Sequence, residues 1–287
     1  MAATVGVAAT AAFGAAARAV ATNKGQLSDP FAEPLLRAAG VDRLVRVVDD
    51  DRFAADDTAG PRFLDVCAAW CRSVDEFAVE AGRAGLRQVV ILAAGLDTRA
   101  YRLWWPPGTT VYEVDRAEAL DFKSEVLRGL GAEPTASRRA VGVDLHRDWP
   151  AALLRVGFDA AAPTVWIAEQ VLIGYLTPGV QDRVLQGVTA MSAAGSRLAA
   201  DHMPTWTPLQ LEAERSFVEG WHRHGLDVDL ASLTHAGQYH YVPDYLAARG
   251  WETVQRNVAG LLGGMGLPGR QGGGTEFVPE YLTATRS

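Results

Sequence analysis

Short apolar runs that alternate with helical segments begin after Gly85, and they constrain the fold more than any other feature of this chain. Runs of this length that are rich in valine and isoleucine are typical of buried strands. Their alternation with helices indicates right-handed strand–helix–strand units and a parallel sheet. The runs are QVVILAA (88–94), TTVYEVD (109–115), RAVGVD (139–144), TVWIAE (164–169) and SRLAAD (196–201). We therefore predict an α/β fold with a mostly parallel sheet.

Helical segments and two further strands are predicted around this sheet. Apolar side chains recur at spacings of three and four over 61–82, and Ser28 or Asp29 before Pro30 indicates another helix start. Segments 251–258 and 277–286 are predicted to complete a sheet of seven strands. The sequence thus predicts a single domain over 1–287, divided into a helical N-terminal cap (1–85), a ligand-binding core (86–204), a helical insertion that roofs the ligand (205–250) and closing strands (251–287).

Composition excludes several classes of partner. With 287 residues, 48% hydrophobic and 21% charged, the chain has the make-up of a globular protein. Its net charge of −7 and its lack of a basic stripe argue against nucleic acid. The alanine-rich start lacks a basic leader, and no run reaches the roughly 20 strongly apolar residues of a membrane span. We predict a cytoplasmic protein with Cys67 and Cys71 buried as free thiols.

Acidic residues stand at the end of every one of the five predicted strands. The carboxyl ends of parallel strands meet at one edge of the sheet, where open α/β sheets bind their ligands. One acid there usually caps a helix, but capping alone is a poor explanation for five in succession. The five are Asp97, Asp115, Asp144, Glu169 and Asp201. They predict a binding site at this edge.

The residue types at this edge favour an adenosine ligand without phosphates. The loop after the first strand, in VVILAAGLDTRAYRL, has a single glycine, Gly95, and lacks both the G-x-G-x-x-G pattern and a phosphate-binding lysine. An acid that closes the second strand, Asp115, suits the two hydroxyls of a ribose. Asp144 after the third strand can accept from an adenine amino group. Acidic walls attract a cation, so S-adenosylmethionine, which carries a sulfonium, fits.

The ordered motifs resemble the leucine carboxyl methyltransferase family, and within it the actinobacterial S-adenosylmethionine-dependent members. The matching stretches are SDPFAEPLL, PRFLDV, VVILAAGLDTRAYRL, VYEVD, VDLHRDWP and IAEQVLIGYLTP. The resemblance covers nearly the whole chain and is weakest over 205–275. It implies a class I methyltransferase fold, which is Rossmann-like, and methyl transfer from S-adenosylmethionine.

Carried over to this sequence, the resemblance implies where the adenosine part of the cofactor lies. Asp115 would hold the ribose, and Asp144 with Leu145 would bracket the adenine. Gly95 and the backbone around Ala93 would let the cofactor lie against the first strand, although the family's usual glycine is replaced by Ala93 here.

The same resemblance implies contacts for the methionine part. Asp97 would line the site, and Glu169 would lie beside the methionine portion. Arg18 and Arg62 occupy positions where the family places basic residues for the cofactor carboxylate; Arg18 fits a solvated helix face equally well. Two departures from the family's pattern concern the residues around the methionine part. Gly60 and Pro61 stand where a second basic residue is usual, and Gly174 in EQVLIGYLTP looks like an extra residue that shifts Tyr175 relative to Glu169.

The histidines supply candidate bases. A carboxylate acceptor is ionised near neutral pH and needs no base, whereas a hydroxyl acceptor profits from one. His202 follows the fifth strand and His240 lies in the insertion, so we select these two, with Tyr175, as candidate catalytic residues. No metal site is predicted, because the insertion's histidines lack a completing cysteine or carboxylate pattern. The insertion's aromatic residues fit an acceptor-stacking surface or the core of the cap; they are Trp206, Trp221, Tyr239 and Tyr241.

The leading hypothesis is a methyltransferase that acts on a carboxylate or hydroxyl oxygen of a small-molecule or natural-product acceptor, as a monomer or homodimer. One alternative is an NAD-dependent oxidoreductase, because Asp115 also suits the ribose of a nicotinamide cofactor; the missing G-x-G-x-x-G speaks against it. Another is a family member that binds the cofactor without methyltransferase activity, which the Gly174 insertion and Ala93 leave open.

Overall fold

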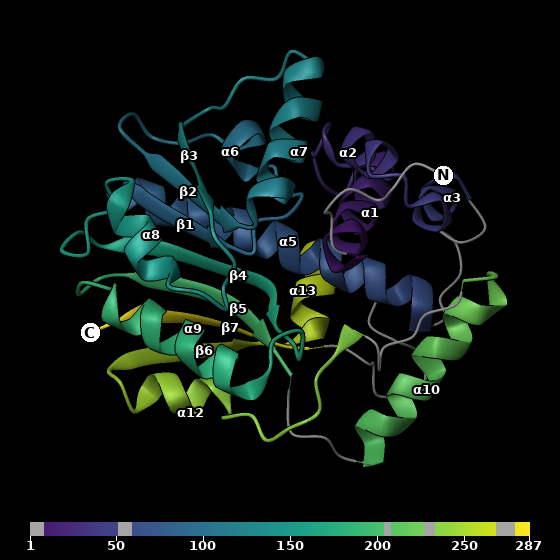
Figure 1. The fold of residues 1–287 in the computed structure, drawn as a ribbon. Helices are drawn as coiled ribbons and strands as arrows, with labels where there is room; N and C mark the ends of the chain where they lie inside the picture. The colour runs from purple at the N-terminus through teal and green to yellow at the C-terminus, as the bar shows by residue number, and fades with distance from the viewer. Residues whose placement is uncertain (1–8, 51–58, 204–207, 227–232, 268–278) are drawn as a thin grey trace.

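A seven-stranded sheet forms the centre of the protein (Figure 1). The computed structural model describes residues 9–50, 59–203, 208–226, 233–267 and 279–287. Within these residues the strand order is β3-β2-β1-β4-β5-β7-β6. The strands are β1 (Gln88–Leu92), β2 (Thr110–Asp115), β3 (Ser137–Gly142), β4 (Thr164–Leu172), β5 (Arg197–His202), β6 (Trp251–Arg256) and β7 (Glu280–Arg286). Only β7 runs antiparallel to its neighbours β5 and β6, so the predicted mostly parallel sheet is confirmed.

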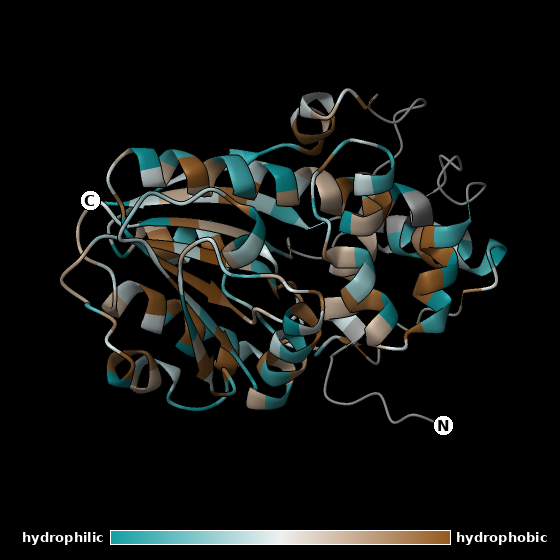
Figure 2. Ribbon diagram, turned by 90° about the horizontal axis from the view of Figure 1, so that it is seen from above, coloured by the Kyte–Doolittle hydropathy of each residue, from teal (hydrophilic) through white to brown (hydrophobic). Residues whose placement is uncertain are grey.

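Helices cover both faces of the sheet. One layer contains α1 (Ala9–Asn23), α5 (Ala59–Arg83), α7 (Ala117–Gly129), α10 (Pro208–Arg223) and α13 (Val258–Gly264). The opposite layer contains α8 (Trp149–Arg155), α9 (Pro178–Ala190) and α12 (Val242–Ala247). Side chains of β1 alternate between the two cores: Val89 and Ile91 face one, and Val90 and Leu92 face the other. Figure 2 shows hydrophobic residues gathered on the strands and on the helix faces toward them.

The described part of residues 1–85 is helical, and its helix α1 lies at the carboxyl ends of the strands (Figure 1). Besides α1 and α5 it contains α2 (Ala32–Ala38) and α3 (Asp42–Asp49). The predicted helix start at Ser28 or Asp29 is wrong, because α2 begins at Ala32 after Phe31. The Asp29 carboxylate instead turns inward and pairs with Arg18 at 2.8 Å. A buried guanidinium needs such a counter-charge.

Two strand ends differ from the sequence-based expectation at the site. The third strand ends at Gly142, so Asp144 follows it by two residues. The fourth does not stop at Glu169 but continues to Leu172 through an irregular stretch. None of the described helices is long and apolar enough to cross a membrane.

Candidate functional site

A cavity of about 390 Å³ lies at the carboxyl ends of the central strands. Its wall consists of one side of α1, the stretch 91–97 at the end of β1, and residues that follow β2, β3 and β4. This volume lies within the range of about 300–1,000 Å³ that is usual for small-molecule sites. The position is also the one that open α/β sheets use for ligands.

Most of the residues selected from the sequence meet in this cavity. Of the nine predicted cofactor residues, those that line it are Arg18, Ala93, Gly95, Asp97, Asp115, Asp144, Leu145 and Glu169. Arg62 is not in the described lining; its side chain is buried in α5. The structure thus brings together residues that are spread over about half of the chain, while their individual binding roles stay predictions.

Two backbone amides hold the Asp115 carboxylate at the end of β2. Gly95 N–H donates to Oδ2 and Arg116 N–H donates to Oδ1, each at 2.7 Å. Each carboxylate oxygen has two lone pairs, so both oxygens keep one for a second donor. The side chain is therefore fixed in one orientation and can accept from two hydroxyls at once.

The backbone of the loop after β1 is unusual at two positions. Ala93 has a φ of +49°, in the left-handed region that glycine adopts without steric cost. Gly95 has a φ of +37°, and a Cβ there would lie 2.9 Å from the Ala11 Cβ in α1. Gly95 is therefore required by the packing of α1 on this loop. The sequence-based reason, close approach of a cofactor, did not include this contact.

Asp144 and its neighbours form the far end of the cavity. Asp144 Oδ1 accepts from the His146 backbone N–H at 2.8 Å and lies 2.6 Å from His146 Nδ1. Partial burial opposes ionisation of Asp144, but the hydrogen bonds from His146 outweigh it and lower the pKa of this carboxyl. Asp144 is thus an anionic acceptor next to the apolar side chain of Leu145, a combination that suits an amino-bearing aromatic ring.

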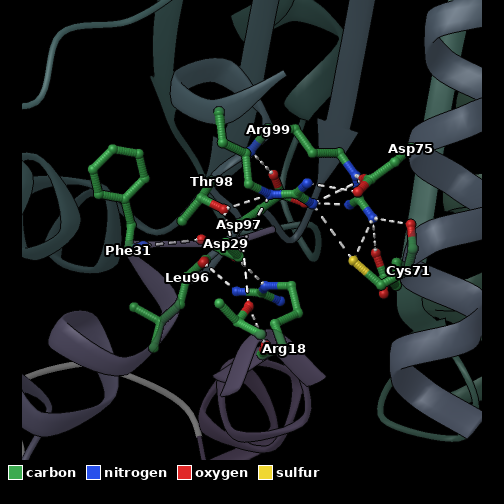
Figure 3. Close-up of polar contacts among 12 residues, drawn as sticks. Arg18, Asp29, Phe31, Cys71, Asp75, Leu96, Asp97, Thr98 and Arg99 are labelled. Carbon is green, nitrogen blue, oxygen red and sulfur yellow. Dashed lines mark hydrogen bonds and ion pairs between the residues drawn. The ribbon is translucent and has the colours of Figure 1, made fainter. Parts of the chain in front are cut away.

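A buried network of charges lies behind the opposite end of the cavity (Figure 3). The side chain of Arg99, on the short helix α6 (Arg99–Arg102), is fully buried. Its guanidinium contacts Asp97, pairs with Glu169 at 2.7 Å and pairs with Asp75 of α5 at 2.7 Å. Burial opposes ionisation of Asp97, but the positive charge of Arg99 contributes most to overcoming it, and the pKa of Asp97 is lowered.

Arg18 links α1 to this network and to the cavity. Its Nε pairs with Asp29 at 2.8 Å, and its Nη2 donates to the carbonyl oxygen of Leu96 at 2.6 Å. Its Nη1 points toward the cavity side of α1, where a Cβ on Gly14 would lie 3.4 Å away. Burial favours the neutral guanidine, but the charge of Asp29 and other carboxylates outweighs it, and the pKa of Arg18 is raised. The solvated-face interpretation of Arg18 is wrong.

Gln170 and Tyr175 line the cavity beyond Glu169. The Gln170 Nε2 lies 3.6 Å from the Cys67 sulfur, and burial raises the pKa of the Tyr175 phenol, which stays protonated near neutral pH. Gly174 has a φ of +89°, and its carbonyl oxygen accepts from the His235 N–H at 2.8 Å. Gly174 therefore makes a turn that reaches the 234–235 segment, and Tyr175 lines the cavity.

The two histidines that were selected as bases lie outside the described lining of the cavity. His202 is fully buried against Tyr241, with ring centroids 5.3 Å apart, and burial lowers its pKa. His240 is exposed, and its Nδ1 lies 2.9 Å from Asp182 Oδ1 on the protein surface. In the described residues no group of three or more His, Cys, Asp and Glu side chains is arranged to hold a metal ion.

The described aromatic residues of the insertion differ in burial: Trp221 is buried, and Tyr239 and Tyr241 are partly exposed. Trp221 is fully buried and contacts Phe13 of α1 edge-to-face at 5.5 Å. The Tyr239 hydroxyl donates to the Leu176 carbonyl oxygen at 2.8 Å, and the Tyr241 hydroxyl donates to Glu280 at 2.9 Å. The burial of Trp221 fits the cap-core interpretation, and Tyr239 and Tyr241 lie outside the described lining of the cavity. Trp206 lies outside the described residues.

Two basic residues of the buried network, Arg99 and Arg102, were not predicted from the sequence. Arg99 and Arg102 both pair with Asp75, which lies on α5. The available signal was the pair of arginines three positions apart in DTRAYRL, directly after a predicted strand and turn. Two basic residues on one face of such a short helix at a sheet edge indicate a charge cluster when an acidic series surrounds them.

The family of this chain follows from its match to known proteins. The pattern of the leucine carboxyl methyltransferase family matches residues 9–189, which contain the cap helices and the first four strands. The chain belongs to this family. All of the cavity-lining residues described above fall inside the matched region, and the insertion and closing strands fall outside it.

Relatives of this chain occur in mycobacteria. A protein from Mycolicibacterium paratuberculosis is 65% identical over 295 residues, which cover 100% of both chains. One from Mycobacterium marinum is 49% identical over 257 residues, which cover 86% of this chain and 83% of that one. Both carry the name "Putative S-adenosyl-L-methionine-dependent methyltransferase". The oxidoreductase alternative is not favoured.

Two solved structures share the fold. One, from Thermobifida fusca, has a TM-score of 0.52 at 17% identity and covers 94% of each chain. The other, a DUF574 family protein from Streptomyces avermitilis, has a TM-score of 0.52 at 17% identity and covers 94% of this chain and 97% of that one. The class I methyltransferase fold predicted from the sequence is therefore confirmed.

Proposed function

We propose that this protein binds S-adenosyl-L-methionine in the cavity and transfers its methyl group to an oxygen of a small-molecule acceptor. The observation that carries the proposal is the Asp115 carboxylate, which two amides fix at 2.7 Å so that both of its oxygens can accept from a ribose. The names of the mycobacterial relatives support the same cofactor.

The donor set of the cavity fits each part of this cofactor. Asp144 and Leu145 would receive the adenine, and Asp115 the ribose. The Arg18 guanidinium, which stays charged, would pair with the cofactor carboxylate through Nη1. The Glu169 carboxylate would accept from the cofactor's ammonium group while Arg99 holds it at 2.7 Å from behind.

The chemistry of the acceptor end favours a carboxylate acceptor. When bound, S-adenosylmethionine supplies an electrophilic methyl group on a sulfonium. A carboxylate oxygen forms a bond to the methyl carbon as the carbon–sulfur bond breaks, which gives a methyl ester and S-adenosylhomocysteine without a proton transfer. A hydroxyl acceptor would need a base. Tyr175, with its raised pKa, is a poor base, and His202 and His240 lie outside the described lining.

The protein's own contribution is therefore alignment. Gln170 and Tyr175 would orient the acceptor by hydrogen bonds, and α1 would exclude water through Thr10, Ala11 and Gly14. Positioning of reactants can supply about 7–11 kcal/mol of the barrier reduction.

Thermal unfolding with three ligands tests the cofactor assignment. S-Adenosylmethionine or S-adenosylhomocysteine at 100 times its Kd should add about 2.7 kcal/mol to the unfolding free energy, and NAD should add none. Asp115→Ala should abolish the shift, and Asp121→Ala, at an exposed position of α7, should retain it. No shift with either adenosyl compound would refute the proposal.

The pH dependence of turnover tests the acceptor class. With a carboxylate acceptor, kcat should stay flat between about pH 6 and pH 8, because no group must lose a proton. A rise that follows one ionisation near neutral pH would refute the carboxylate acceptor and indicate a hydroxyl.

A further inference from the structure

The strand β4 is irregular where it meets the cavity. Ala168 pairs with Ala200 of β5, and Leu172 pairs with His202, so β4 advances four residues while β5 advances two. Gln170 lies in the middle of this bulge with a φ of +56°, which is rare for a residue with a side chain. The bulge is confined to the three residues 169–171.

The bulge places two neighbouring side chains on the same side. In a regular strand, consecutive side chains point to opposite faces of the sheet. Here both Glu169 and Gln170 line the cavity. An uninterrupted β4 would present only one of them, so the irregular backbone defines what a ligand at this end meets.

Asp201 of β5 holds the centre of the bulge. The Gln170 N–H takes no part in the regular backbone pairing between β4 and β5, and it donates to Asp201 Oδ1 at 2.7 Å. A buried N–H must find an acceptor, and the carboxyl replaces the lost backbone carbonyl. Asp201 is 2% exposed and is not part of the described lining of the cavity.

We propose that Asp201 is a positioning residue, which fixes the β4 bulge so that Glu169 and Gln170 face the ligand. It acts without touching the cofactor or the acceptor. We call the hydrogen bond from the Gln170 N–H to Asp201 the clamp, and it follows from the geometry alone. Its consequence for ligand binding rests on the proposed function.

The charge state of Asp201 identifies its best replacement. Burial, and next the negative charge of Glu169, raise the pKa of Asp201 well above its usual range, which favours the neutral carboxyl. An asparagine is also neutral and keeps a carbonyl oxygen as acceptor at the same place. Alanine removes the acceptor. The pair Asp201→Asn and Asp201→Ala therefore separates the hydrogen bond from the charge.

Hydrogen exchange in the unliganded protein tests the clamp. Asp201→Ala should increase deuterium uptake in peptides that cover 165–176, and Asp201→Asn should leave it as in the parent. Leu198→Ala, which truncates a buried side chain of the same strand, controls for general loss of stability. Uptake in Asp201→Ala equal to that of the parent, or of Leu198→Ala, would overturn the clamp.

Titration calorimetry with S-adenosylhomocysteine tests the consequence. Asp201→Ala should weaken binding about tenfold, the size of one lost hydrogen bond, and Asp201→Asn and Leu198→Ala should stay within about threefold of the parent. Increased uptake with unchanged affinity would overturn the positioning role. Failure of the parent itself to bind would refute the proposed function and this role with it, while the exchange result still decides the clamp.

Discussion

Removal of the Arg99 side chain should strongly destabilise this protein. Its side chain is fully buried, and it contacts three carboxylates: Asp97, Asp75 at 2.7 Å and Glu169 at 2.7 Å. Arg99→Met keeps much of the volume but removes the counter-charge that Asp97 and Glu169 share, while Asp75 keeps its ion pair with Arg102. Breaking a buried ion pair in this way costs about 3–5 kcal/mol, because an uncompensated charge stays in the interior.

The expected change in melting temperature follows from the length of the chain. At about 2.1 cal/mol/K per residue, a chain of 287 residues has an unfolding entropy of about 0.6 kcal/mol/K. A loss of about 3–5 kcal/mol then lowers Tm by about 5–8 °C. Differential scanning calorimetry of the parent and of Arg99→Met at neutral pH measures it.

Arg72→Met is the matched control. Arg72 lies one residue after Cys71 on α5 and forms an exposed ion pair with Glu76 at 3.1 Å. Such a pair is worth about 0.3–0.5 kcal/mol, so Tm should fall by less than about 1 °C. A drop of less than about 2 °C for Arg99→Met would refute the view that the cluster depends on this guanidinium.

The pH dependence of the same variant has a definite sign. The folded pKa of Asp97 is lowered, so its stabilising contribution is present above the unfolded pKa and is lost as pH falls through the folded value. In Arg99→Met, the positive charge of Arg99 no longer opposes the effect of burial on Asp97, so this carboxyl takes up its proton at a higher pH than in the parent. The stability deficit of the variant should therefore shrink between about pH 7 and pH 5. A constant deficit over that range would contradict the assigned cause.

Two further predictions concern single positions. Gly95→Ala should lower the unfolding free energy by about 2–4 kcal/mol in denaturant titrations, because its Cβ would lie 2.9 Å from that of Ala11 at a positive φ; Gly108→Ala, with a φ of +82° and no atom within 4 Å, should cost only about 1–2 kcal/mol. Asp201→Asn should gain stability relative to the parent between about pH 5 and pH 8, by up to about 1.4 kcal/mol per pH unit. The reason is that the raised pKa of Asp201 makes the parent less stable as pH rises above the unfolded value. Equal pH slopes would show that Asp201 is ionised when folded.

The strands and the acids at their ends could be predicted from the sequence because each rests on a local pattern. The apolar run before Gly95 is buried throughout β1, and Asp115 closes β2 as its place in VYEVD predicts. Strand alternation and the rule that ligands bind at carboxyl ends then suffice to place the candidate site.

The buried pairs could not be predicted in this way, because they join segments far apart in the chain. Asp75 lies on α5, Arg99 on α6 and Glu169 in β4. The sequence around each residue gives no indication that it contacts the other two. The bulge at Gln170 was equally hidden, because a glutamine gives no sign of a positive φ. The prediction of His202 as a base at the site failed for a related reason. The Asp201 side chain points to the bulge, and the neighbouring His202 side chain points to Glu280 instead of the cavity.

The helix α1 connects these features into one unit. Its residue Arg18 pairs with Asp29, and Asp29 accepts from Thr98 at 2.7 Å, directly before the arginine helix α6. The same helix supplies Ala11 to cover Gly95, and four of its residues line the cavity: Thr10, Ala11, Gly14 and Arg18. The cavity is therefore complete only with α1 in place. The charge network that includes Arg18 also borders the cavity in which we propose that the ligand binds, so variants of Arg18 or Asp29 should alter stability and ligand affinity together.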